Sequence, residues 1–272
     1  MGDTTDLRGG TAVVTGAATG VGRALALEAA WRGLRVIVAD VNDGGETVDL
    51  VAQLGGTAEA HRVDVADYAS MERLAATARD RFGGVTLLVN NAASGGDAGG
   101  LDTVDPKQTE IQFAVNILGV FNGIRAFADD LKRAATEGGS AFILNVGSEH
   151  SLGVPPHVKP ISTYTAAKYA VLGLTDTARR DFAGTGVGVS LLAPGWVRTE
   201  RVAEYMAHSP EFRQAVEPYA QEAELVARVA FDGLLAGEPL IVTNPKSVPF
   251  AREHAQEMLA ALDRAESRPP TP

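Results

Sequence analysis

Seven short apolar runs alternate with longer amphipathic stretches over most of this 272-residue chain. The runs are rich in β-branched residues and are bounded by Gly, Asp or Asn, which is typical of buried parallel strands. They cover residues 11–16, 34–40, 58–65, 86–92, 140–148, 187–195 and 239–245. Strands that alternate with helices form βαβ units. The pattern therefore predicts an α/β fold, in which a doubly wound, mostly parallel seven-stranded sheet carries helices on both faces (Rossmann-like).

Helical periodicity fills the intervals between these runs. The clearest helical stretches are residues 22–33, 70–83, 111–135 and 163–186. No Pro- or Ser-rich linker interrupts the series, so we expect one domain over residues 1–272. The last residues, 265–272, are polar and Pro-rich, and we expect them to form a flexible tail.

Three irregular segments follow strand ends, at residues 93–109, 149–163 and 198–224. In open α/β sheets, ligands bind beyond the carboxyl ends of the strands. We therefore expect the three segments to frame one cleft, with residues 198–224 as a substrate lid.

The composition excludes several classes of function. The formal net charge is −10, with 34 acidic and 24 basic residues, which argues against nucleic acid or an anionic membrane as partner. The chain has no cysteine, and its five histidines show no metal-ligand spacing, so we expect no disulfide and no metal site. The first residues, MGDTTDLRGGT, contain no apolar run, and no unbroken apolar window is long enough to span a bilayer. A cytoplasmic protein is the expectation.

A glycine-rich turn follows the first strand run. Gly16, Gly20 and Gly22 lie between that strand and a helix, where a tight turn and a helix N-terminus favour a pyrophosphate. Their spacing is G-x-x-x-G-x-G rather than the usual dinucleotide fingerprint, and a purely structural turn would show the same glycines. Asp40 ends the second strand, about 20 residues later, where a carboxylate accepts from a ribose 2′-hydroxyl and repels a 2′-phosphate. No Arg or Lys occurs at 15–22 or 40–45, so NAD is favoured over NADP.

Tyr164 and Lys168 lie four residues apart at the start of a predicted helix. This spacing brings both side chains to one helix face. Taken alone it is compatible with an accident of a solvated face or with an acid–base pair.

Five short motifs in order give the chain a resemblance to a known family. They are TGAATGVG (15–22), NNAA (90–93), NVGS (145–148), YTAAK (164–168) and PGWVRT (194–199). Together they resemble the single-domain branch of the short-chain dehydrogenase/reductase family over roughly residues 8 to 200. The resemblance implies direct hydride transfer between NAD and a carbinol carbon of a small alcohol or ketone, and it implies a homodimer or homotetramer.

The same resemblance implies a catalytic tetrad of Asn116, Ser148, Tyr164 and Lys168. Tyr164 would exchange a proton with the substrate oxygen, helped by the Lys168 cation and the positive nicotinamide. Lys168 would also hold the nicotinamide ribose, Ser148 would bond the reacting oxygen, and Asn116 would hold a relay water. Cofactor contacts would come from Gly16, Thr19, Gly20, Val21, Gly22, Asp40, Val41, Asp64, Val65, Asn90, Asn91, Ala92, Tyr164, Lys168, Pro194, Gly195, Val197 and Thr199.

One departure from the family pattern leaves open which serine, Ser148 or Ser151, bonds the substrate oxygen. Ser148 lies 16 residues before Tyr164, a few more than is usual, and the usual interval reaches Ser151 instead. We prefer Ser148 because NVGS follows the strand run as in the family, and the extra residues fit the PPHVKP loop.

Several other residues carry weaker expectations. Glu149, His150, His157 and Lys159 are expected to be solvated loop residues, with His150 the best candidate for a substrate contact. Trp196 would either line the cleft or pack. The apolar stripe of Ile111, Val115, Leu118 and Phe121 would serve helix packing or a subunit contact.

Two other functions compete with a dehydrogenase. A nucleotide-sugar epimerase or dehydratase also uses a Tyr–Lys pair, but its branch usually needs a larger C-terminal domain than the residues after Thr199 provide. A non-catalytic NAD-binding sensor would be expected to lose the Tyr, Lys or Ser, and this chain keeps all three.

Overall fold

The computed structural model describes residues 7–157 and 159–268. All seven expected strands form one parallel sheet in the order β3-β2-β1-β4-β5-β6-β7. Their bounds are β1 Thr11–Thr15, β2 Arg35–Asp40, β3 Ala58–Arg62, β4 Leu87–Asn90, β5 Ala141–Val146, β6 Val187–Ala193 and β7 Leu240–Val242. The chain starts in the middle of the sheet, winds to one edge and returns to the other, so the predicted doubly wound fold is confirmed.

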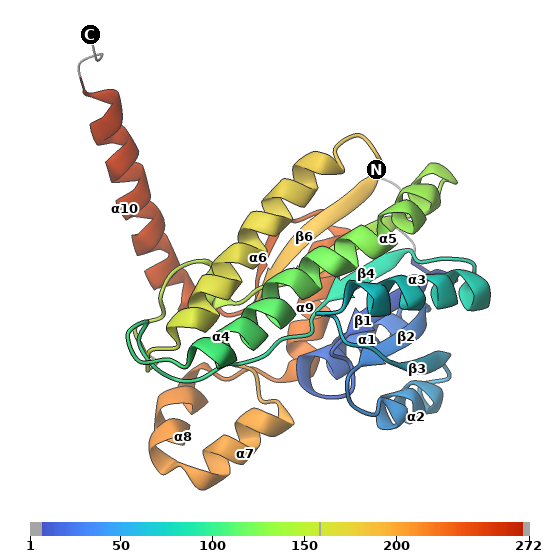
Figure 1. The fold of residues 1–272 in the computed structure, drawn as a ribbon, viewed down its shortest axis with the longest axis horizontal. Coiled ribbons are helices and arrows are strands. Elements are labelled where there is room, and N and C mark those ends of the chain that lie inside the picture. Colours follow the sequence, from blue (N-terminus) through green and yellow to red (C-terminus); the bar gives the residue numbers. More distant parts are fainter. Residues whose placement is uncertain (1–6, 158, 269–272) are drawn as a thin grey trace.

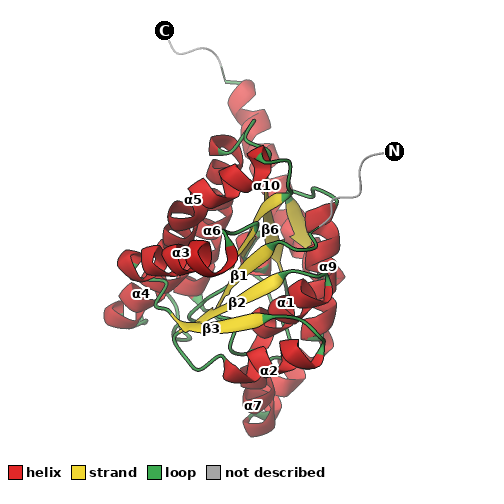
Figure 2. Ribbon diagram, turned by 90° about the vertical axis from the view of Figure 1, so that its right-hand side faces the viewer, coloured by secondary structure: helices red, strands yellow, loops and turns green. Residues whose placement is uncertain are grey.

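Helices cover both faces of the sheet (Figures 1 and 2). One face carries α1 (Gly20–Trp31), α2 (Gly45–Gln53) and α9 (Ala223–Leu235), and the other carries α3 (Tyr68–Phe82), α4 (Pro106–Phe113), α5 (Gly119–Thr136) and α6 (Ser162–Asp181). A π-helical turn, Ala114–Leu118, joins α4 to α5 without a break.

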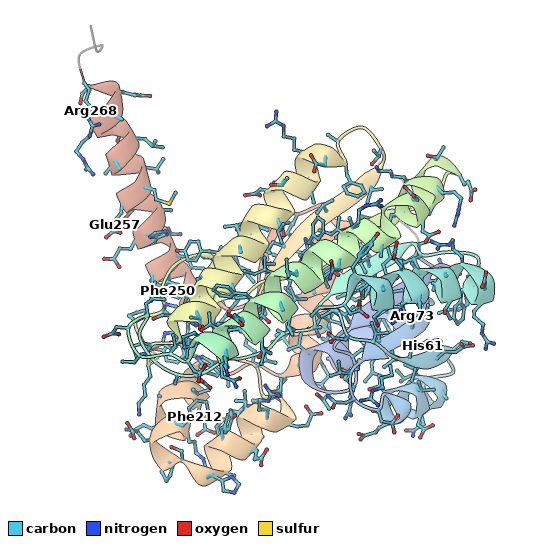
Figure 3. The ribbon with its side chains drawn as sticks, in the orientation of Figure 1. His61, Arg73, Phe212, Phe250, Glu257 and Arg268 are labelled. Carbon is cyan, nitrogen blue, oxygen red and sulfur yellow. The ribbon has the colours of Figure 1, made fainter. Side chains whose placement is uncertain are left out.

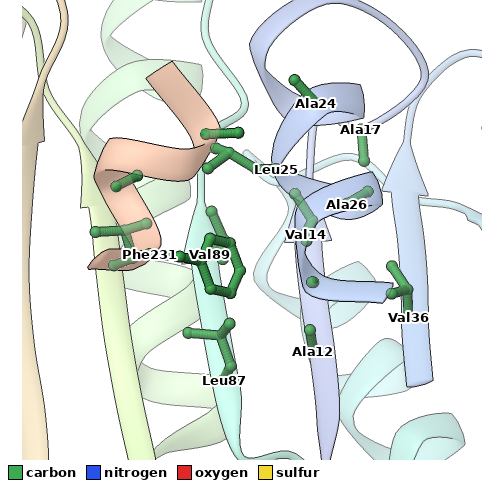
Figure 4. Close-up of a cluster of buried hydrophobic side chains, with 14 of the residues drawn as sticks. Ala12, Val14, Ala17, Ala24, Leu25, Ala26, Val36, Leu87, Val89 and Phe231 are labelled. Carbon is green, nitrogen blue, oxygen red and sulfur yellow. The ribbon is translucent and has the colours of Figure 1, made fainter. Parts of the chain in front are cut away.

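The largest core lies between the sheet and the α1–α9 layer. Inward side chains of β1 and β4 meet Leu25 of α1 and Phe231 of α9, all fully buried (Figure 4). On the opposite face, Phe127 and Leu131 of α5 pack with Met71 of α3. Because both faces of the central strands are buried, these strands read as continuous apolar runs in the sequence.

The helical stretch Pro106–Thr136 contains a window that is apolar and long enough to cross a membrane by composition alone. Val120, Phe127 and Leu131 of this stretch are buried in the fold, and α5 contacts β4 and β5. The stretch is therefore a covering helix of the sheet whose other side stays exposed.

The C-terminal third adds smaller elements beyond the sheet. Residues 198–224 form α7 (Glu200–His208), α8 (Pro210–Val216) and a 3₁₀ turn, Glu217–Tyr219. A second 3₁₀ turn, Pro245–Ser247, leads into α10 (Val248–Glu266), which projects from the body and buries none of its residues (Figures 1 and 3). Within the expected tail, α10 includes residues 265 and 266, and residues 269–272 lie outside the described part, as do residues 1–6.

Candidate active site

A tight glycine-rich turn joins β1 to α1 at the carboxyl edge of the sheet. Gly16 has φ +65°, and a Cβ there would lie 2.8 Å from the Ala92 Cα. At Gly22 a Cβ would lie 2.0 Å from the Gly16 carbonyl oxygen, so only glycine fits. Thr19, the N-cap residue of α1, provides no side-chain cap. The N-cap side chain thus leaves the first amides of α1 to other acceptors, and a helix N-terminus of this kind favours anions.

Asp40 lies beside this turn at the end of β2. Its Oδ2 accepts from the Ala18 N–H at 3.0 Å, and its Oδ1 accepts from the Asn42 N–H at 2.9 Å. These bonds fix the carboxylate next to the glycine-rich turn, where a ribose would bind. Val41 follows it with an exposed side chain, as a residue at the rim of a site would have.

Two arginines lie near Asp40 in the fold, outside residues 15–22 and 40–45, which contain no Arg or Lys. Arg23 donates from Nη2 to the Ala18 carbonyl at 2.6 Å and pairs with Glu46 at 2.6 Å. Arg62 stands opposite Asp40 in the β2–β3 register and is exposed.

The NNAA segment buttresses the glycine-rich turn from β4. Asn91 donates from Nδ2 to the Thr15 carbonyl at 2.9 Å and to the Gly16 carbonyl at 3.1 Å. The Ala92 N–H donates to the Thr15 hydroxyl at 3.1 Å. Asn90 points along the sheet and donates to Asn145 Oδ1 at 2.8 Å. The turn and NNAA therefore form one rigid unit.

Asp64 and Val65 follow β3 at the same edge. The Asp64 carboxylate accepts from the Ala66 N–H at 2.9 Å, and the Val65 carbonyl accepts from Asn122 Nδ2 at 2.8 Å. The Asn122 side chain therefore has a structural role, because it joins α5 to this turn.

Ser148, Tyr164 and Lys168 come together where the C-terminal end of β5 meets the N-terminal end of α6. The Ser148 side chain lies close enough to Tyr164 to lower the pKa of its phenol, and Lys168 Nζ lies 5.5 Å from the Tyr164 ring centroid. Lys168 is 3 % exposed and donates to the Val146 carbonyl at 2.8 Å. The four-residue spacing on α6 thus brings the cation to the phenol.

Ser151, the rival serine, is occupied by main-chain bonds. Its Oγ donates to the Lys168 carbonyl at 2.8 Å and accepts from the Ser148 N–H at 3.2 Å. It is fully buried. Between the two serines, Ser148 is the one that contacts Tyr164.

Desolvation is the main cause of the pKa shifts of Tyr164 and Lys168. Burial raises the pKa of Tyr164 to about 12, against the Ser148 hydrogen bond, and the nearby Glu149 charge raises it further. Burial likewise lowers the pKa of Lys168 to about 8. Both changes oppose ionisation, so the chain alone keeps the phenol protonated.

Asn116 lies in the π-helical turn and is buried. Its Oδ1 accepts from the Ser94 N–H at 2.7 Å, and its Nδ2 donates to the Ser94 carbonyl at 2.9 Å. π-helical turns are frequent at functional sites. Here the turn anchors the start of the loop at residues 93–109.

The expectation that Glu149, His150 and His157 are solvated is wrong. Glu149 is 2 % exposed and bonded to the Ser247 hydroxyl, and desolvation raises its pKa. His157 stacks on Tyr219 with ring centroids 3.9 Å apart, and its Nε2 lies 3.6 Å from Glu149 Oε1. Burial depends on these partners from the distant C-terminal part of the chain, which local sequence cannot supply. Lys159 is exposed, as expected.

His150 belongs to the same site as Tyr164. Its ring meets the Tyr164 ring edge-on at 5.3 Å, and its Nδ1 lies 2.8 Å from the Thr165 hydroxyl. Burial, with the nearby charges of His157 and Lys168, lowers the pKa of His150 to about 4. A neutral imidazole therefore lies beside the phenol.

The PGWVRT segment runs from β6 to the lid. The Pro194 carbonyl accepts from the Glu149 N–H at 2.8 Å, Val197 is buried, and Thr199 caps α7 by accepting from the Val202 N–H at 3.3 Å. A Cβ at Gly195 would lie 2.6 Å from Asn244 Nδ2. Trp196 packs edge-on against Phe212 of α8, labelled in Figure 3, and its buried Nε1 has no protein partner among the described residues.

The arrangement provides a phenol, a hydroxyl and a cation at the same sheet edge as the glycine-rich turn and the Asp40 carboxylate. Within residues 7–157 and 159–268, no three His, Asp or Glu side chains lie close enough to hold a metal ion. The chemistry that these groups can supply is proton exchange with an oxygen beside a bound dinucleotide.

A family model described as short chain dehydrogenase matches residues 10–209. The 2-(R)-hydroxypropyl-CoM dehydrogenase of Xanthobacter autotrophicus is 34 % identical over 86 % of this chain and 93 % of its own length. Cyclohexanol dehydrogenase of an Acinetobacter species is 28 % identical over 87 % of this chain and 92 % of its own. The solved structure of a short chain dehydrogenase/reductase from Burkholderia phymatum, in complex with NAD, has 30 % identity and a TM-score of 0.83 and covers 98 % of each chain.

Proposed function

The chain belongs to the short-chain dehydrogenase family, and from that premise we propose that it is an NAD-dependent oxidoreductase that interconverts a secondary alcohol and a ketone. The observation that carries the proposal is the convergence of three side chains: Lys168 Nζ lies 5.5 Å from the Tyr164 ring centroid, and Ser148 lies close enough to the phenol to lower its pKa. A hydroxyl, a phenol and a cation on one wall are the groups that a carbinol oxygen needs to lose or gain its proton.

The cofactor would lie across the sheet edge from Asp40 to Thr199. The Gly16–Gly22 turn fits a diphosphate because a Cβ at either glycine would collide with backbone, and the N-cap residue Thr19 does not cap the α1 N-terminus beyond. Asp40 would accept from the adenosine ribose, and Lys168 would hold the nicotinamide ribose. Asn90, Asn91 and Ala92 would support the adenosine from below, Asp64 and Val65 would meet the adenine edge, and the residues from Pro194 to Thr199 would follow the nicotinamide.

Bound NAD⁺ supplies the hydride acceptor and a positive charge close to Tyr164. Tyr164 exchanges the proton of the substrate hydroxyl, and Ser148 holds the same oxygen. The Lys168 cation and the positive charge of bound NAD⁺ would together favour the phenolate, against the desolvation that keeps the phenol protonated in the chain alone. Asn116 would contribute a relay water through its main chain, because both polar atoms of its side chain are bonded to Ser94.

The substrate that we infer is a neutral secondary alcohol or ketone with an apolar body. Support comes from the aromatic contacts between Trp196, Phe212 and Tyr205 in the lid, and from His150, which burial holds neutral beside Tyr164. The names of the relatives describe dehydrogenases of hydroxyl compounds, including a 3beta-hydroxysteroid dehydrogenase of Eggerthella lenta, 33 % identical over 78 % of this chain.

Residues 198–224 would close over that substrate as a lid. We take the whole chain to be one domain. We further propose that the protein is a homodimer or homotetramer, because Ile111, Leu118 and Phe121 leave an apolar stripe about half exposed on the α4–α5 layer. We also propose that it acts in the cytoplasm.

The direct test is NADH formation with a panel of cyclic and acyclic secondary alcohols. Turnover with NAD on at least one neutral secondary alcohol is expected. NAD binding without turnover on any alcohol would favour a sensor, and turnover of nucleotide sugars alone would favour an epimerase or dehydratase.

Asp40→Asn tests the cofactor preference. The variant keeps the acceptor for the Ala18 N–H but removes the charge that repels a 2′-phosphate. We expect the NADP-to-NAD ratio of kcat/KM to rise roughly ten- to a hundredfold, equivalent to about 1.4–2.7 kcal/mol. A wild-type enzyme that already prefers NADP, through Arg23 or Arg62, would contradict the role given to Asp40.

A further inference from the structure

A carboxylate from the lid contacts the glycine-rich turn. Glu200 is the first residue of α7, and its Oε2 accepts from the Gly20 backbone N–H at 2.9 Å. Its Oε1 lies 3.2 Å from Arg23 Nη1. The lid also touches the turn through Thr199, since a Cβ at Gly20 would lie 3.0 Å from the Thr199 Cγ2.

The atom that Glu200 engages belongs to the anion-binding end of α1. Gly20 is the first residue of α1, so its N–H is one of the amides that a helix leaves unpaired. The first turn of α1 contains no acidic residue and Thr19 does not cap it. In the described part of the chain, Glu200 is therefore the anion that complements this helix end.

A diphosphate at this turn would use the same feature that holds Glu200. Carboxylate and phosphate oxygens both accept from backbone N–H groups at a helix N-terminus, and both are stabilised by its dipole. Two anions at one helix end repel each other, so the Glu200 contact and the diphosphate exclude or weaken each other.

The contact is also weak enough to be replaced. The Glu200 side chain is 55 % exposed, and an ion pair at that exposure contributes little to stability. Arg23 is anchored independently of it, through the Ala18 carbonyl and Glu46, so the turn keeps its shape when Glu200 leaves.

We propose that Glu200 is an internal competitor of the dinucleotide: its carboxylate holds the first turn of α7 on the glycine-rich turn in the cofactor-free enzyme and is displaced by the diphosphate. Glu200 thereby lowers cofactor affinity and couples cofactor binding to release of the lid. The inference rests on the proposed function in one respect, that the ligand of this turn is a dinucleotide.

The test is calorimetric titration of wild type, Glu200→Gln and Glu204→Gln with NAD, ADP-ribose and adenosine. Glu204 is the matched control because it is an exposed glutamate one turn further along α7. We expect Glu200→Gln to bind NAD and ADP-ribose about three- to tenfold more tightly than wild type, with adenosine affinity unchanged. Glu204→Gln should bind all three as wild type does.

A second readout needs no cofactor. In hydrogen exchange of the cofactor-free proteins, the amides of α7 should exchange faster in Glu200→Gln than in wild type and Glu204→Gln, because the tether to α1 is weakened.

Unchanged or weaker NAD binding by Glu200→Gln would overturn the inference. An equal gain in Glu204→Gln would also overturn it, because the effect would then be one of overall charge. Failure of the wild type to bind any dinucleotide would overturn the proposed cofactor itself, which separates the two claims.

Discussion

At the level of single residues, the chemistry depends on neighbours that sequence spacing does not reveal. Spacing brought Tyr164 and Lys168 to one helix face, and the resemblance supplied Ser148. The cost of burying these groups follows only from the fold, because the surrounding atoms raise the pKa of Tyr164 to about 12 and lower that of Lys168 to about 8. In the mechanism that we propose, the positive charge of the bound cofactor would be needed to bring the phenol into its working range.

His150 shows how burial beside Tyr164 makes stability depend on pH. The pKa of His150 falls from 6.5 in the unfolded chain to about 4 in the folded protein. Between these two pH values the unfolded chain binds a proton at His150 and the folded protein does not. The contribution of the neutral imidazole is complete above pH 6.5 and is lost as the pH falls toward 4. Between about pH 7 and about pH 5 this loss amounts to about 2 kcal/mol.

Urea unfolding of wild type and His150→Gln at these two pH values measures that loss. The variant should lose about 2 kcal/mol less than wild type on acidification. The exposed His208→Gln is the control and should follow wild type, and the opposing titration of Glu149 is common to all three proteins. Parallel pH dependences for wild type and His150→Gln would show that the imidazole titrates normally.

At the level of elements, strand positions could be predicted because buried parallel strands leave a strong local signal. β1 and β2, which pair with a strand on each side, follow the expected runs to within one residue. β3 is shorter than the expected run 58–65, since Val63 leads into the turn before α3, which Asp67 caps. The π-helical turn around Asn116 could not be predicted, because nothing in AVNIL distinguishes it from α-helix.

The burial of Glu149 and His157, which follow Ser148 in the chain, also escaped prediction, and their partners lie far away in sequence. Glu149 bonds to Ser247, 98 residues later, and His157 stacks on Tyr219 at the end of the lid. Phe250, at the base of α10, lies within 6.5 Å of the His157 ring (Figure 3). This cluster fixes the loop after β5 to the C-terminal segment.

Ser247→Ala tests that attachment. The substitution leaves the buried Glu149 carboxyl without its hydroxyl partner, and we expect it to lower the free energy of unfolding by about 1–3 kcal/mol. Ser267→Ala, whose hydroxyl bonds only the nearby Arg264 carbonyl on the exposed end of α10, should cost much less. Equal effects in urea unfolding would mean that the Glu149–Ser247 bond does not stabilise the loop.

At the level of the whole molecule, the exposed apolar stripe on α4 and α5 bears on assembly. Ile111, Leu118 and Phe121 are 54 %, 52 % and 51 % exposed, although they lie on helices whose opposite side is core. The sequence left open whether this stripe packs internally or meets another subunit, and its exposure favours the subunit contact.

Phe121→Asp tests this assignment by light scattering coupled to size exclusion. A buried, unpaired carboxylate in the interface should shift the protein from an oligomer to the monomer mass. Leu54→Asp, at a comparably exposed leucine at the end of α2, should leave the mass unchanged. An unchanged oligomer in Phe121→Asp, or a monomeric wild type, would exclude this stripe as the interface.

We propose that Tyr164 is the acid–base group of hydride transfer between NAD and an alcohol, and single-turnover measurements on Tyr164→Phe test this role. The substitution removes only the hydroxyl, so NAD affinity should stay within a few-fold of wild type. The rate of NADH formation with a substrate alcohol should fall roughly 10²- to 10⁴-fold and lose its rise with pH. NADH formation at the wild-type rate with an unaltered pH profile would exclude Tyr164 as the acid–base group.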